Sequence, residues 1–179
     1  MDTFANFILS ETDYERKLEI AYYFSKRMGI FFDNTVIFKT ELARMFIEDM
    51  NIDIDKNLVL TACLLYACKK PTNTNDINKI KSYTKDGAEY LSTLGFDKRF
   101  CKICEEANRY SESKNREKES DILELVDNFG GMLLNRPERI GIPVDEAIVL
   151  LEHRNLKGKN NQYLEQFKQF VSITEGIAV

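Results

Sequence analysis

The chain has 179 residues, of which 44% are hydrophobic, and this is enough to bury one hydrophobic core. Its formal net charge of −4 argues against nucleic-acid binding, because proteins that bind nucleic acid usually present a basic face. The longest nearly uninterrupted apolar run, residues 58–68, is shorter than the roughly 20 residues that a membrane-spanning helix needs. We therefore expect neither nucleic acid nor a membrane as a partner.

The amino terminus lacks the basic and apolar stretches of a secretory signal, so the sequence predicts a cytoplasmic protein. Its four cysteines are then expected to be reduced thiols. Cys63, Cys68, Cys101 and Cys104 could in principle hold a structural zinc ion. However, Cys63 and Cys68 would point about 140° apart on a helix, which favours ordinary buried thiols. No cofactor is expected.

Apolar residues recur at three- and four-residue steps along almost the whole chain, and this spacing is typical of α-helices. The spacing of Thr12 and Glu15 fits a capping box at the start of a helix. Further helices are predicted at about 36–50, 56–69, 75–93, 97–111, 118–134, 143–154 and 160–173. Because no segment alternates between apolar and polar residues, we expect an all-α bundle of about seven or eight helices.

Residues 1–34 are expected to form a helical extension that packs on the domain made by residues 35–179. Aromatic residues crowd this extension: Phe4, Phe7, Tyr14, Tyr22, Tyr23, Phe24, Phe31 and Phe32. The simpler interpretation is that they cover one side of the bundle, as aromatic residues at helical spacing usually do. The alternative is an exposed surface that binds a partner or a second copy of the chain.

Five segments with a characteristic order and spacing carry the strongest functional signal: residues 64–70 (LLYACKK), 83–91 (YTKDGAEYL), 103–110 (ICEEANRY), 122–139 (ILELVDNFGGMLLNRPER) and 144–148 (VDEAI). Together they resemble the HD-GYP branch of the HD phosphohydrolase superfamily, in which helices hold two or three metal ions through His and Asp side chains. In the first segment, Tyr66 stands where the family has histidine and Ala67 where it has aspartate, whereas Lys70 matches the family lysine.

Most of the other ligand positions are also replaced. The early family histidine would fall near Phe38 or Lys39, and Tyr83 stands where another histidine is expected. Glu106, Ala107 and Asn108 replace a His-His-Glu series, and the sequence has no GYP loop after them. The final family aspartate is kept as Asp127.

The resemblance implies an HD-type helical bundle but not its chemistry. Activating a bridging water requires several imidazoles and carboxylates that converge on clustered metal ions. The only histidine, His153, lies where the family has no ligand. The sequence therefore predicts a catalytically inactive protein without a metal. It also predicts that Tyr66 or Tyr83 donates a hydrogen bond to Asp127, or that Lys70 or Arg109 neutralises it.

Three functions remain open at this point. The first is a regulatory or interaction module that acts through a protein partner and could be a homodimer. The second is a receptor that binds a nucleotide or another phosphate ligand without hydrolysing it, since ammonium and guanidinium groups suit phosphate oxygens. Its candidate residues are Lys70, Arg109, Arg136 and Arg139, beside the carboxylate of Asp127. The third is a weak metal-dependent phosphodiesterase that uses Asp127 with Glu106.

Overall fold

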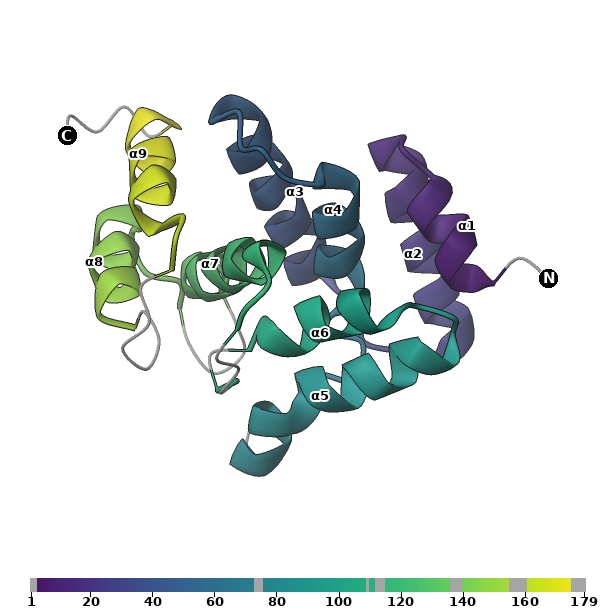
Figure 1. Ribbon diagram of the computed structural model, residues 1–179. Coiled ribbons are helices and arrows are strands. Elements are labelled where there is room, and N and C mark those ends of the chain that lie inside the picture. Colours follow the sequence, from purple (N-terminus) through teal and green to yellow (C-terminus); the bar gives the residue numbers. More distant parts are fainter. Residues whose placement is uncertain are drawn as a thin grey trace.

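A computed structural model describes residues 3–72, 76–108, 110–111, 115–135, 140–154 and 161–174 (Figure 1). Within these ranges the chain forms nine α-helices and no strand, which confirms the predicted all-α class. The helices are α1 (Phe4–Ser10), α2 (Tyr14–Met28), α3 (Asn34–Asp49), α4 (Lys56–Leu65), α5 (Ile77–Thr93), α6 (Lys98–Glu106), α7 (Lys118–Leu133), α8 (Val144–Arg154) and α9 (Leu164–Thr174). None of these described helices is both long enough and apolar enough to cross a membrane.

Aspartate side chains define where the helices begin. Five successive helices, α2 to α6, start directly after an aspartate whose carboxylate accepts a hydrogen bond from a backbone N–H of the first turn: Asp13, Asp33, Asp55, Asp76 and Asp97. The predicted capping box at Thr12 is therefore wrong, because Asp13 caps α2 and accepts from the N–H of Arg16 at 2.9 Å. Aspartate is at least as good as threonine in this role.

The helices surround a core to which α3, α4, α6 and α7 all contribute. The α7 helix contacts α3, α4 and α6, and α5 lies along the outer side of α6 (Figure 1). At one end of the molecule, α8 packs on α7 and α9 packs on α3 (Figure 1). There the rings of Phe46, Phe129 and Phe167 meet edge to face, with centroids 5.1–5.3 Å apart. This arrangement places α7 at the centre of the bundle.

The helices α1 and α2 form the other end of the molecule and contact α4 (Figure 1). Two features fix α1 in place. Gly95, just after α5, has a φ of +94°, and a Cβ there would lie 2.7 Å from Thr3, so only glycine fits. The ammonium group of Lys17 on α2 donates to the carbonyl of Ile8 at 2.5 Å and to the hydroxyl of Thr61 on α4 at 2.9 Å. A buried lysine thus ties three helices together.

Two helices, α4 and α6, end four and five residues before their predicted ends, inside two of the segments on which the resemblance to HD-GYP proteins is based. The α4 helix stops at Leu65, and residues 66–69 continue as tight turns in which N–H groups bond to carbonyls three residues back. The α6 helix stops at Glu106 instead of continuing to residue 111. Such tightening is common at helix ends and is not visible in hydrophobic periodicity.

Candidate functional site

A polar cluster lies around Asp127, in the middle of α7. The ammonium group of Lys39, from α3, lies 2.6 Å from Oδ1 of Asp127. The hydroxyl of Tyr66, at the end of α4, donates a hydrogen bond to the same oxygen, which confirms one of the predicted contacts. Lys39 and Tyr66 are each only 2% exposed. Three helices therefore converge on one carboxylate.

The cluster keeps Asp127 ionised and Tyr66 protonated. Burial alone would raise the pKa of Asp127, but the positive charges of Lys39 and Lys70, with the hydrogen bonds from Lys39 and Tyr66, lower it below its usual value. Burial and the negative charge of Asp127 raise the pKa of Tyr66 well above its usual value. Tyr66 is therefore a hydrogen-bond donor at neutral pH, and the charge of Asp127 is balanced by an ammonium group.

Lys39 is the residue that sequence reasoning missed, although it stands where the early family histidine would fall. A lysine is normally exposed, so its type gives no reason to place it in a core. Its position along the helix does give such a reason. One helix face, with three- and four-residue spacing, carries Val36, Lys39, Thr40 and Ala43, and all four are buried. Gly130 on α7 leaves the necessary space, since a Cβ there would lie 3.0 Å from Cγ of Lys39.

The side chains at the family's other ligand positions do not fit a cluster of metal ions. Ala67 and Ala107 are buried and offer no donor atom, and Tyr83 is a buried phenol, which is a poor metal ligand at neutral pH. Among the described residues, no three or more His, Cys, Asp or Glu side chains are grouped so that they could hold a metal ion. At Asp127, the ammonium group of Lys39 and the hydroxyl of Tyr66 already bind Oδ1, so a cation could reach this oxygen only by displacing them.

The structure does not bring Glu106 to Asp127. The Oε2 atom of Glu106 accepts hydrogen bonds from the N–H of Glu117 at 2.9 Å and from the hydroxyl of Ser120 at 2.8 Å. Glu106 therefore caps the start of α7, where the helix dipole favours a negative charge. Ser120 and Asp127 are seven residues apart on this helix, or about 10 Å along its axis. This separation disfavours the predicted use of both carboxylates on one Mg²⁺ ion.

The basic residues predicted to bind phosphate are only partly placed. The ammonium group of Lys70 lies 5.4 Å from the centroid of the Phe31 ring, and its charge acts on Asp127. Arg109, Arg136 and Arg139 lie outside the described residues. The predicted phosphate-binding set therefore cannot be assembled from the described part of the chain.

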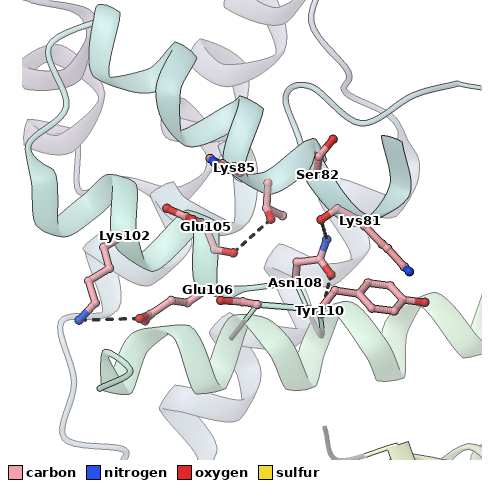
Figure 2. A pocket seen from close by; sticks show the side chains of 10 residues that line it. Lys81, Ser82, Lys85, Lys102, Glu105, Glu106, Asn108 and Tyr110 are labelled. Carbon is pink, nitrogen blue, oxygen red and sulfur yellow. Dashed lines mark hydrogen bonds and ion pairs between the residues drawn. The ribbon is translucent and has the colours of Figure 1, made fainter. Parts of the chain in front are cut away.

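A polar pocket of about 480 Å³ opens between α5, the end of α6 and the turn that follows it (Figure 2). Figure 2 shows Lys102 and Glu106 towards one side and Lys81 with Tyr110 towards the other. The ammonium group of Lys81 lies 5.6 Å from the centroid of the Tyr110 ring. The side-chain amide of Asn108 donates to the carbonyl of Ile80 at 3.0 Å and so holds the turn against α5. The volume of this pocket falls within the range of sites that bind small molecules.

All four cysteines are free thiols, and they lack the arrangement needed for a structural zinc ion. Cys63, Cys68 and Cys104 are buried. Burial raises the pKa of Cys68 to about 12 and that of Cys104 well above its usual value. These thiols are therefore protonated and unreactive at neutral pH.

Comparison of the chain with protein-family models, with curated proteins and with solved structures finds no match in any of the three. The similarity to HD-GYP proteins thus remains a prediction made from the order and spacing of short segments. The function has to be inferred from the geometry of the Asp127 cluster and of the neighbouring surfaces.

Proposed function

We propose that this protein is a non-catalytic member of the HD-GYP-like helical bundles and works as a regulatory or interaction module. One observation carries the proposal: the ammonium group of Lys39 lies 2.6 Å from the carboxylate of Asp127, with the phenol of Tyr66 on the same oxygen. A cation built into the chain thereby takes the place that a metal ion has in the family.

The chemistry of the replacement supports a structural role for the cluster. A divalent metal ion lowers the pKa of a bound water towards about 7 and so generates hydroxide at neutral pH. An ammonium group can balance the charge of Asp127, but it has no coordination position for a water or a phosphate oxygen. Without metal ions, the centre of the bundle would contain a polar void unless other side chains filled it. Lys39 and Tyr66 are buried there, and both donate to Oδ1 of Asp127.

A second candidate function, a receptor for an anionic ligand, is favoured by the pocket between α5 and α6. Lys81 and Lys85 lie one turn apart on α5 and both line this pocket, where they could meet phosphate or carboxylate oxygens. Calorimetric titration with a cyclic dinucleotide and with inorganic phosphate distinguishes the two functions. Heat that is lost in the Lys81→Gln/Lys85→Gln variant would favour the receptor, whereas the interaction module predicts no heat with either ligand.

A turnover assay tests the leading proposal. The purified protein is incubated with Mn²⁺ or Mg²⁺ and a generic phosphodiester, beside the variants Asp127→Asn and Asp145→Asn. Asp145 is an exposed carboxylate on α8 and serves as the matched control. We expect all three proteins to give only the background rate. Turnover that disappears in Asp127→Asn and persists in Asp145→Asn would overturn the proposal.

A further inference from the structure

The surface formed by α1 and α2 has an aromatic groove that the proposed function does not use. The groove has a volume of about 350 Å³ and is lined by Phe4, Phe7, Ile20, Tyr23 and Phe24, together with the charged residues Arg16 and Glu19. The helices α1 and α2 lie at the end of the molecule away from α8 and α9 (Figure 1). Several other aromatic residues of the amino-terminal region, such as Tyr14, Phe31 and Phe32, pack against the core as expected. Phe4 both packs against the core and lines the groove, whereas Phe7 and Tyr23 are exposed.

Packed aromatic rings form the floor of the groove, and its rim is exposed. The ring of Phe4 stacks on that of Phe24 with centroids 3.7 Å apart, and it also meets Phe96 edge to face at 6.2 Å. On the rim, Tyr23 is 69% exposed and Phe7 is 58% exposed. A preformed apolar groove beside large exposed rings is typical of an interaction surface.

The charges along α2 indicate which partner fits this surface. Glu19, Tyr23 and Arg27 are spaced by four residues, are all exposed and follow one face of the helix. Glu19 lies about 6 Å along the axis on one side of Tyr23, and Arg27 lies about 6 Å on the other side. Within the described part of the chain, neither Glu19 nor Arg27 has an ion-pair partner, whereas the nearby Arg16 reaches Glu11 at 3.5 Å.

We propose that this surface binds a second copy of the chain, with the two α2 helices antiparallel about a two-fold axis near Tyr23. In this arrangement Glu19 faces the partner's Arg27, and Arg27 faces the partner's Glu19. The Tyr23 ring of each copy enters the groove of the other. A parallel arrangement would instead oppose like charges, so the charge order along α2 selects the antiparallel dimer. The inference goes beyond the proposed function and depends only on the α1–α2 surface.

Charge reversal tests the proposed pairing with the full chain. Sedimentation equilibrium at low salt is expected to give a mass near twice the 20.8 kDa of one chain. Each contact occurs twice in a symmetric dimer, so Glu19→Arg and Arg27→Glu should each weaken the dimer Kd at least tenfold. The double variant Glu19→Arg/Arg27→Glu should restore the Kd to within about threefold of the original, because it recreates both pairs with opposite polarity.

Two controls keep the test independent of folding and of unspecific charge effects. Glu89→Arg reverses an exposed charge on α5 and should leave the Kd unchanged. Circular dichroism and thermal unfolding should show that every variant is folded. A wild-type protein that stays monomeric at all accessible concentrations would overturn the inference. A dimer Kd that neither single charge reversal changes would also overturn it. The same holds if the double variant does not recover the Kd of the wild type.

Discussion

Two buried lysines show how differently one side chain can be accommodated in the same bundle. Lys39 meets a carboxylate, Asp127, whereas Lys17 meets a carbonyl and a hydroxyl, those of Ile8 and Thr61. Lys17 is 1% exposed and Lys39 is 2% exposed, so their burial is nearly equal. Burial lowers the pKa of Lys17 to about 8, against an ordinary value of 10.5. The two sites therefore differ in the charge of the contacting group, since only Lys39 meets an ionised partner.

The largest effect is expected when Lys39 is replaced. Lys39→Met removes the ammonium group that contacts Asp127, whose side chain is only 19% exposed, and this should destabilise the fold by about 3 kcal/mol. Urea unfolding at pH 7 measures the loss. Because the charge of Lys70 alone then acts on Asp127, the pKa of Asp127 should be higher than in the wild type, so the deficit should shrink as the pH is lowered towards about 4. A loss below about 1 kcal/mol would show that Lys39 does not balance the charge of Asp127.

A smaller effect is expected at the second donor of the cluster. Tyr66→Phe removes the hydroxyl that donates to Asp127 but keeps the ring. A hydrogen bond to a charged group contributes about 1.5–3 kcal/mol, so the free energy of unfolding should fall by about 2 kcal/mol. Tyr23→Phe, which alters an exposed phenol, provides the matched control and should change the monomer's stability by less than about 0.5 kcal/mol.

The smallest effect is a pH dependence that sharpens the contrast between the two lysines. Since the pKa of Lys17 is about 8 when folded and 10.5 when unfolded, the unfolded chain binds more protons between these values, and stability should rise with pH there. The rise due to Lys17 should be about 1 kcal/mol between pH 8 and pH 9. Lys17→Met should lack this increment when its unfolding curves are compared with those of the wild type. Equal slopes in the two proteins would contradict the lowered pKa.

The sequence predicted the helical architecture well, because the three- and four-residue spacing of apolar residues survives in every described helix. It predicted the Tyr66–Asp127 contact because a buried carboxylate needs donors and the neighbouring motif offered a phenol. The contact of Lys39 with Asp127 was not predicted. The spacing of residues along α3 places Lys39 on the buried face, but a lysine is normally exposed, and the residue type was given more weight than the spacing. The role of Glu106 could not be read from local sequence, because its partners lie 11 and 14 residues further along the chain.

The central claim is that Lys39 occupies the place of a metal ion at Asp127, and a calorimetric titration with Mn²⁺ tests it most directly. The wild-type protein is expected to show no stoichiometric site, and Asp127→Ala should give the same weak background. A site that binds one or two Mn²⁺ ions per chain and vanishes in Asp127→Ala would contradict the claim.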